Sequence, residues 1–385
     1  MLYVGCVNAQ SAKLPKKLIE YGWDIPTTDF VKQNVRQMEL RPFDGVVIKL
    51  KAGSSVFRHK PLDPKEFAQD LENLQTTNYS KFTDNFVLMW ATTDKGWDWF
   101  SDSDWEASEQ NIALFAKTAR AGWCVGIAFD PETYKQYGVN PWIYSNLPHA
   151  KEKSFSEYWQ QVRKRGAQFI QALEQEIPGV KVLTFFQLSY LSEFLDEPDS
   201  VKRMRQLSRA DYGLLPAFLN GMLDVAQPNT AIVDGNENAY YYAAPESFSQ
   251  GYNLIRQRAL ALIEPKNRRK YALQVQAGHA LYIDQLFGLR KPQKSFLSYY
   301  LTQQERAKWL EHNTYYALLT SDEYVWCYSE EMNWWTSKVP AGVQEAIESA
   351  RQKIKMKLPL GFNIQEMLQK AEKKLLRSKR TKNSE

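Results

Sequence analysis

The feature that most constrains the fold of this chain is the regular alternation of short apolar runs with longer amphipathic stretches. Short apolar runs are typical of buried parallel strands, and amphipathic stretches are typical of the helices that cover them. We therefore predict strands at 17–21, 46–50, 86–90, 124–129, 182–186, 230–233, 271–275 or 280–283, and 324–328. The helices between them are expected at 27–40, 63–76, 105–121, 154–176, 212–225, 245–262 and 302–319.

About eight such units make up a (β/α)8 TIM barrel. The chain has 385 residues, of which 44% are hydrophobic and 24% charged, which is typical of a globular protein. We expect an α/β fold: a single TIM barrel at 15–340 with elaborated loops after its strands. A short N-terminal segment, 1–14, precedes it, and a C-terminal helix with a basic tail, 341–385, follows. We expect this tail to fray after Leu376.

In such a barrel the loops that follow the strands meet at one rim, and the chemistry sits there. The clearest strand end lies within 122–142, where Pro131 cannot donate to a strand ladder, so the strand should end at Asp130. Glu132 and Tyr134 follow at once. Acids and aromatic residues also follow the other strands, namely Trp23, Asp24, Trp97, Asp98, Asp234, Glu237, Tyr240, Asp284, Glu330, Trp334 and Trp335.

Acids beside aromatic rings are what a sugar-cleaving site requires. One carboxylic acid protonates the leaving oxygen, a second carboxylate attacks the sugar or activates water, and aromatic rings stack on the sugar faces. The catalytic candidates are Asp130, Glu132, Asp234, Glu237 and Glu330. The substrate-binding candidates are Trp23, Asp24, Trp97, Asp98, Tyr134, Tyr240, Asp284, Trp334 and Trp335.

Some of these residues also have a purely structural interpretation. Asp130 can cap the turn that follows it, and Asp234 opens an Asp-Gly-Asn turn sequence. Trp334 and Trp335 can pack as a lid over the barrel. An aromatic content of 14% likewise fits either a site that stacks on sugar rings or a large aromatic core.

Four segments of the chain resemble a bacterial group of TIM-barrel proteins described as glycoside-hydrolase-like. They are Glu20-Tyr21-Gly22-Trp23-Asp24-Ile25-Pro26, Pro42-Phe43-Asp44-Gly45, Phe129-Asp130-Pro131-Glu132-Thr133-Tyr134, and Tyr328-Ser329-Glu330 with Trp334-Trp335. The likeness extends from about Lys16 to Trp335 and implies a barrel. Retaining α-glycosidases with such barrels often place the nucleophile after strand four and the acid/base after strand six. The resemblance thus implies Asp130 as nucleophile and Asp234 as acid/base, with Glu132, Glu237 and Glu330 as substitutes or as ligands of sugar hydroxyls.

We therefore expect a glycosidase that acts on an oligosaccharide or polysaccharide without a cofactor or metal. Two alternatives stay open. The first is a barrel that binds glycans through Trp97, Trp334 and Trp335 without cleaving them. The second is a divalent-metal hydrolase with oxygen ligands from Asp130, Glu132, Asp234 and Glu330. The four histidines show no HxH or HExxH spacing and the three cysteines no CxxC pair, so a zinc site is not predicted.

Charge and the chain start bear on partners and location. The net charge is +5; residues 351–385 carry eleven Lys/Arg and three Asp/Glu, or +8, so the remainder carries −3. We interpret the basic tail as a solvated helix and expect no nucleic-acid partner. No apolar run approaches the ~18 residues of a membrane span. Residues 2–9 resemble the end of a lipoprotein signal, so we expect a periplasmic, extracellular or lipid-anchored protein ahead of a cytoplasmic one.

Overall fold

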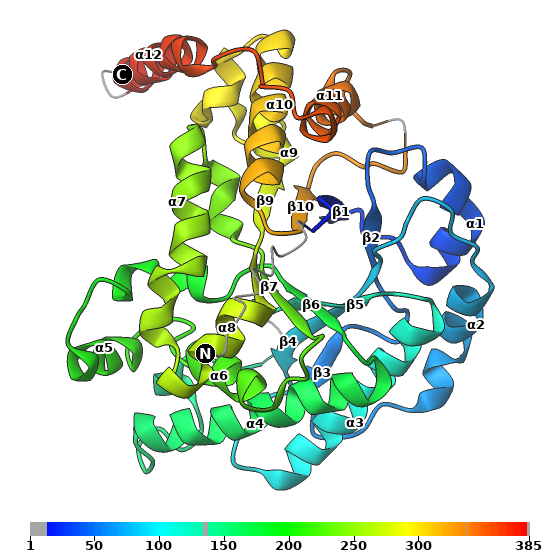
Figure 1. The fold of residues 1–385 in the computed structure, drawn as a ribbon, viewed down its shortest axis with the longest axis vertical. Coiled ribbons are helices and arrows are strands. Elements are labelled where there is room, and N and C mark those ends of the chain that lie inside the picture. Colours follow the sequence, from blue (N-terminus) through cyan, green and yellow to red (C-terminus); the bar gives the residue numbers. More distant parts are fainter. Residues whose placement is uncertain (1–13, 134–137, 337, 383–385) are drawn as a thin grey trace, which may run out of the picture.

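The computed structural model describes residues 14–133, 138–336 and 338–382, and its centre is a nearly closed, all-parallel barrel (Figure 1). Within these residues, nine strands follow one another around it in the order β8-β7-β6-β5-β4-β2-β1-β10-β9, and β3 pairs with β4 outside this path. The strands are β1 (Lys17–Gly22), β2 (Gly45–Ile48), β3 (Ser55–Phe57), β4 (Phe86–Thr93), β5 (Gly126–Asp130), β6 (Lys181–Thr184), β7 (Ala231–Asp234), β8 (Val275–Ala277), β9 (His279–Tyr282) and β10 (Tyr324–Ser329).

Helices surround this ring of strands on its outer side (Figure 1), so the predicted TIM-barrel-like α/β architecture is confirmed. None of the described helices is both long and apolar enough to cross a membrane. The α-helices are α1 (Thr28–Met38), α2 (Ala68–Thr76), α3 (Asp102–Ala121), α4 (Phe155–Glu176), α5 (Ser200–Leu207), α6 (Leu215–Val225), α7 (Pro245–Arg256), α8 (Arg268–Gln274), α9 (Ile283–Phe287), α10 (Gln303–Thr320), α11 (Val343–Met356) and α12 (Gln365–Lys382).

Two predictions about individual elements were wrong. The segment 271–275, offered as one position for the seventh strand, is largely helix α8, whose Tyr271 turns inward and donates a hydrogen bond to the carbonyl of Ile255 at 2.7 Å. The second position, 280–283, overlaps β9. The C-terminal region holds two helices instead of one followed by a fraying tail, and α12 continues past Leu376 to Lys382.

The ring closes where β8 meets β9. Strand β8 pairs with β7 and β9 pairs with β10, and Gly278 alone separates the two in sequence. The N–H of Gly278 donates to the carbonyl of Asp234 at 2.8 Å. A Cβ there would lie only 3.1 Å from the carbonyl oxygen of Tyr324. A single interrupted strand thus joins the two edges of the sheet.

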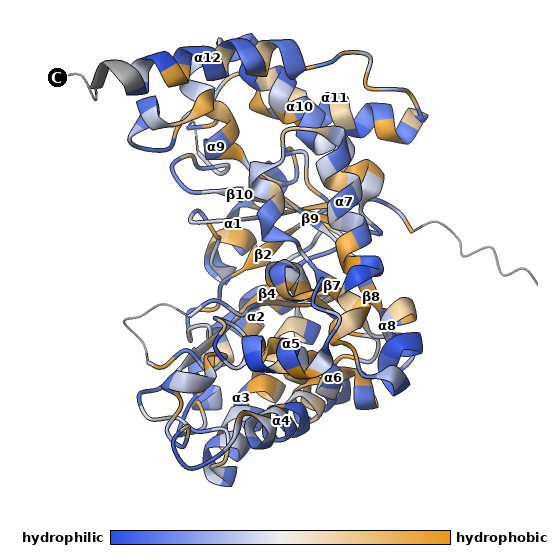
Figure 2. Ribbon diagram, turned by 90° about the vertical axis from the view of Figure 1, so that its left-hand side faces the viewer, coloured by the Kyte–Doolittle hydropathy of each residue, from blue (hydrophilic) through white to orange (hydrophobic). Residues whose placement is uncertain are grey.

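Side chains fill the inside of the barrel. The inward apolar layer includes Ile19, Val47, Phe86, Leu88, Ala128, Leu183, Val233 and Ala280. Figure 2 shows apolar residues concentrated on the strands and polar residues on the outer faces of α3, α4 and α12. Ion pairs close the N-terminal end, where Lys17 lies 2.7 Å from Asp84 and Lys181 lies 2.8 Å from Glu323. These ion pairs stabilise the end of the barrel that lies opposite the end where barrel chemistry sits.

At the opposite, C-terminal end the interior is closed by aromatic rings. The ring centroids of Tyr21 and Phe185 are 4.1 Å apart, and those of Phe185 and Trp326 are 4.6 Å apart. Tyr240 lies 5.3 Å from Trp326 and 5.5 Å from Tyr328. This aromatic floor blocks access to the barrel centre, so any ligand at this end must bind above it.

A carboxyl group is buried on the outer side of β1. Glu20 is fully buried beside Val46 and Cys327 of the neighbouring strands, and its carboxyl group interacts with that of Asp24. Burial and then the charge of Asp24 raise the pKa of Glu20 well above its usual value. In the folded protein Glu20 therefore keeps a proton that it loses in the unfolded chain once the pH exceeds about 4.3.

We predict that replacing Glu20 stabilises the protein above this pH. Because the folded state holds the extra proton, the stabilisation associated with it is complete at low pH and is lost as the pH rises toward the folded-state pKa. Glu20→Met should raise the unfolding free energy at pH 8 by about 1–3 kcal/mol, and by less at pH 4. Urea unfolding at both pH values measures this. Glu20→Gln, which removes only the charge, should lose the pH dependence; an unchanged slope would contradict the assignment.

Candidate functional site

Three of the predicted acids lie together at the C-terminal ends of β5 and β7. The backbone N–H of Glu132 donates to the carboxylate of Asp130 at 2.9 Å. Glu132 and Glu237 interact electrostatically. The negative charges of all three acids also contribute to raising the pKa of the Tyr212 hydroxyl. Residues from two loops, separated by more than 100 positions in the chain, thus form one acidic cluster above the aromatic floor.

The strand β5 determines where Asp130 points. Ala128 belongs to the interior layer of the barrel, and alternation along a strand directs Asp130 to the same side. Asp130 is only 3% exposed. The strand ends there, and the carbonyl of the next residue, Pro131, accepts a hydrogen bond from the indole of Trp142 at 2.8 Å. Asp130 therefore holds the backbone of Glu132 at the edge of the barrel mouth.

A tight turn after β7 presents Glu237. Asn236 adopts a left-handed conformation with φ of 47°, which asparagine tolerates better than most residues, and the short 3₁₀ helix η4 (Glu237–Tyr241) follows. Burial and then the negative charge of Glu132 raise the pKa of Glu237 to about 7. Near neutral pH Glu237 therefore exists in both protonated and ionised forms, as a general acid requires.

Glu132 differs from Glu237 in its access to solvent. Its side chain is exposed, whereas that of Glu237 is half-buried. Partial burial by the surrounding protein nevertheless raises the pKa of Glu132. An exposed carboxylate can reach a ligand, and its charge favours the protonated form of its neighbour. Glu132 and Glu237 thus have different environments and can take different roles.

Tyrosines that sequence reasoning did not single out form one side of the cluster. The rings of Tyr190 and Tyr212 lie 4.9 Å apart, and both interact with the charges of Glu132 and Glu237. Tyr212 has a φ of 60°, an unusual conformation for a tyrosine and one that functional sites often contain. The only signal in the sequence was the mixed aromatic and acidic content of the loop after β6.

Exposed aromatic rings occur around the mouth. Trp23 after β1 is 73% exposed and donates its indole N–H to the hydroxyl of Tyr328 at 2.5 Å. Tyr241, in η4, is 62% exposed, and Tyr190 is 42% exposed. Large aromatic rings that stay in contact with water are available to stack on a flat ligand. Tyr240, also predicted here, is instead part of the aromatic floor.

The carboxylate of Asp234 is directed away from the acidic cluster. Its outward position on β7 follows from Val233, which faces the barrel interior. It accepts hydrogen bonds from the N–H groups of Gln187 at 3.2 Å and Ser189 at 2.8 Å, and from the Ser189 hydroxyl at 2.5 Å. The carboxylate of Asp234 thus anchors the loop after β6.

Asp24 and Asp284 hold the loop after β10 in a similar way. The carboxylate of Asp284 accepts hydrogen bonds from the backbone N–H groups of Glu330 at 2.6 Å, Glu331 at 3.0 Å and Met332 at 3.2 Å. The carboxylate of Asp24 accepts a hydrogen bond from the backbone N–H of Trp334 at 2.7 Å. Because their carboxylate oxygens accept hydrogen bonds from the backbone, both residues hold the loop after β10 in place rather than contact a ligand.

Glu330 lies on another part of the rim. It is exposed and accepts a hydrogen bond from the hydroxyl of Tyr282. The hydroxyl of Tyr328 interacts with the charges of both Glu330 and Glu237. Glu330 therefore borders the mouth without belonging to the Glu132–Glu237 pair.

The remaining predicted residues divide between core and loops. Trp97 stacks on Phe57 at 5.1 Å and Trp334 packs edge-on against Phe43 at 4.8 Å, both buried and closed to a ligand. Asp98 pairs with His149 at 2.9 Å. The half-buried Trp335 donates its indole N–H to the carbonyl of Asp24 at 2.9 Å, and Tyr134 lies outside the described residues.

The acids named for a metal site do not form one in the part of the chain that the structure describes. No group of three or more His, Cys, Asp or Glu side chains there has the arrangement of a metal site. Asp234 faces the outer side and Glu330 bonds to Tyr282, so the four carboxylates named from the sequence do not converge.

Comparison with known proteins does not extend this picture. No family model and no curated protein matches this chain. Of the resemblance stated from the sequence, the TIM-barrel-like fold is confirmed.

We predict that Glu237 titrates near pH 7 and that this value depends on Glu132. The negative charge of Glu132 favours the neutral form of Glu237, so Glu132→Gln should lower the pKa of Glu237. Carboxyl ¹³C NMR titration, with Glu237→Gln to assign the resonance, measures both values. Glu109 on α3 also has a pKa raised by burial but lies on another element, so Glu109→Gln serves as the control and should leave Glu237 unchanged.

A second prediction concerns the loop after β10. Asp284→Ala should lower the unfolding free energy by about 2–4 kcal/mol. The buried carboxylate of Asp284 accepts hydrogen bonds from backbone N–H groups, and the substitution leaves these N–H groups without a partner. Urea denaturation measures the effect. Asp196→Ala, which removes only an exposed pair with Arg258, should change stability little. Equal stability of the two variants would remove the anchoring role of Asp284.

Proposed function

We propose that this protein hydrolyses glycosidic bonds at the mouth of its barrel. The observation that carries the proposal is the pair formed by Glu132 and Glu237, in which one carboxyl is exposed and the other has its pKa raised to about 7. Two carboxyl groups with different protonation states are what glycoside hydrolysis requires. Their position at the C-terminal ends of barrel strands supports the same reaction.

The two carboxyl groups take different roles in this proposal. Glu237 donates a proton to the glycosidic oxygen as the bond to the leaving sugar breaks. Glu132, in its ionised form, attacks the anomeric carbon or removes a proton from the attacking water. Asp130 positions Glu132, because its carboxylate accepts a hydrogen bond from the backbone N–H of Glu132 at 2.9 Å. Burial and the charge of Glu132 raise the pKa of Glu237, so that part of the Glu237 population keeps its proton at neutral pH.

Aromatic rings at the rim bind the substrate. Trp23, Tyr190 and Tyr241 expose ring faces to solvent at separate points around the mouth, and such faces stack on sugar rings. The floor made by Tyr21, Phe185 and Trp326 prevents the substrate from entering the barrel. The substrate therefore lies across the mouth, as an extended oligosaccharide or polysaccharide does.

The proposal is tested first with a screen of aryl glycosides and bacterial polysaccharides, then with Glu237→Gln on the best substrate. Loss of the general acid should slow cleavage of an unactivated oligosaccharide by about 10²–10⁴-fold. Cleavage of a dinitrophenyl glycoside should suffer much less, because that leaving group departs without a proton. The wild-type rate should fall as the pH rises through about 7, since Glu237 must carry its proton.

The control and the contradicting results are distinct. Glu109→Gln, on the outer helix α3, should keep full activity. Glu132→Ala should lose cleavage of both kinds of substrate, because its carboxylate acts whatever the leaving group is. Binding of glycans without any product would replace hydrolysis by a binding function, and full activity of Glu237→Gln would remove Glu237 from the mechanism.

A further inference from the structure

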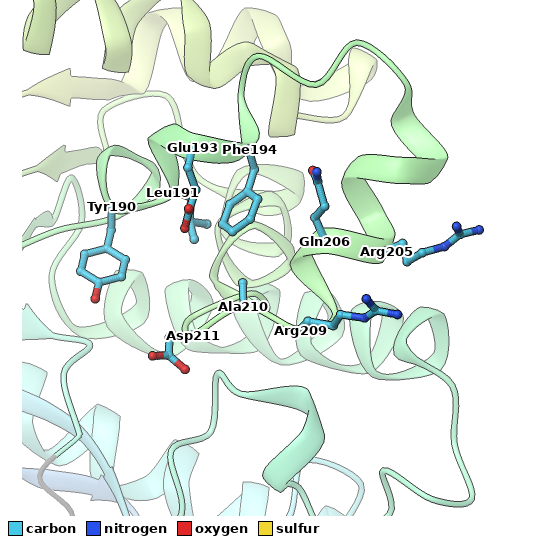
Figure 3. Close-up of a pocket in the computed structure, with 9 residues that line it drawn as sticks. All are labelled: Tyr190, Leu191, Glu193, Phe194, Arg205, Gln206, Arg209, Ala210 and Asp211. Carbon is cyan, nitrogen blue, oxygen red and sulfur yellow. The ribbon is translucent and has the colours of Figure 1, made fainter.

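A hollow with a volume of about 530 Å³ lies on the loop after β6, between the 3₁₀ helix η3 (Leu188–Phe194) and helix α5 (Figure 3). Tyr190 belongs both to this hollow and to the acidic cluster, since it lines the first and interacts with the charges of Glu132 and Glu237. The hollow is therefore next to the proposed cleavage site. A ligand chain that leaves the cluster past Tyr190 enters it.

The two ends of this hollow carry opposite charges. Tyr190 and Asp211 lie at one end, while the side chains of Arg205 and Arg209 extend together at the other end (Figure 3). Both arginines are exposed. The end nearer the acidic cluster thus repels anions, and the far end attracts them.

The guanidinium groups of Arg205 and Arg209 are available to a ligand. Within 14–133, 138–336 and 338–382, neither side chain makes an ion pair or a hydrogen bond, whereas other arginines of the region are engaged. Arg203 bonds to the carbonyl of Glu197, and Arg258 pairs with Asp196 at 2.6 Å. Guanidinium groups bind a carboxylate, sulfate or phosphate with paired hydrogen bonds.

We propose that this hollow is a subsite for an anionic group on the substrate, so that the protein acts on a negatively charged glycan. This inference rests on the proposed glycosidase function. The anionic group binds at Arg205 and Arg209, while the sugars at the cleavage site carry no charge that Glu132 or Glu237 would repel. The acidic mouth and the basic far end together fix the direction in which the glycan lies.

The test is calorimetric binding with oligosaccharides that differ in charge alone. An oligosaccharide with a single terminal uronic acid is compared with its methyl ester, and oligosaccharides with one terminal sulfate or phosphate are each compared with the neutral parent, so that these comparisons identify the preferred anion. The wild-type protein should bind at least one charged form about tenfold or more tightly than its neutral partner. In Arg205→Ala/Arg209→Ala this preference should disappear while binding of the neutral form remains.

Matched variants separate the possible results. Lys202→Ala removes a positive charge from α5 at a residue that does not line the hollow, and it should keep the preference. Glu237→Gln should also keep it, because binding does not need the acid. A wild-type protein that binds charged and neutral forms equally, or a preference that survives the double substitution, overturns the subsite. Cleavage of neutral glycans without a charge preference leaves the glycosidase proposal intact and removes only this inference.

Discussion

The structure depends on one recurring interaction, in which an aspartate at the end of one strand accepts backbone N–H groups from the loop of the adjacent strand. Asp234 at the end of β7 holds the loop after β6, and Asp284 after β9 holds the loop after β10. Asp24 holds the second of these loops from the side of β1. Carboxylates bound in this way fix the rim, which lets Glu132 and Glu237 keep defined places on otherwise irregular backbone.

The same arrangement explains why the acidic cluster is shallow. Aromatic rings fill the barrel directly below it, and Trp326 is fixed by a 2.8 Å hydrogen bond from its indole to the carbonyl of Gly235. Burial against this floor, rather than a deep pocket, supplies the low-polarity surroundings that shift the pKa of Glu237. Ion pairs such as Lys17–Asp84 and the acids with raised pKa values thus lie at opposite ends of the barrel axis.

The sequence was sufficient for the architecture and for the neighbourhood of the site, but not for the roles within it. The β/α alternation located the strands of the ring, apart from 271–275, where an apolar stretch belongs to a helix. It did not predict the short strand β3, which pairs with β4 outside the ring. To decide which of Asp130 and Asp234 belongs to the acidic cluster, one must know which side chain faces the barrel interior. Strands buried on both faces have no polar alternation to show this. Trp97 and Trp334 illustrate the same gap, because a tryptophan after a strand packs into the core as readily as it lines a mouth.

The interruption at Gly278 has a consequence for how the molecule is made. Strand β1 pairs with β10, so the first strand synthesised waits for a partner about 300 residues further along the chain. Until then the edges of β1 and β9, which both pair with β10, have unpaired backbone groups on the ribosome. Such edges are the places where nascent chains associate wrongly, and a chain that stops before β10 would carry them permanently.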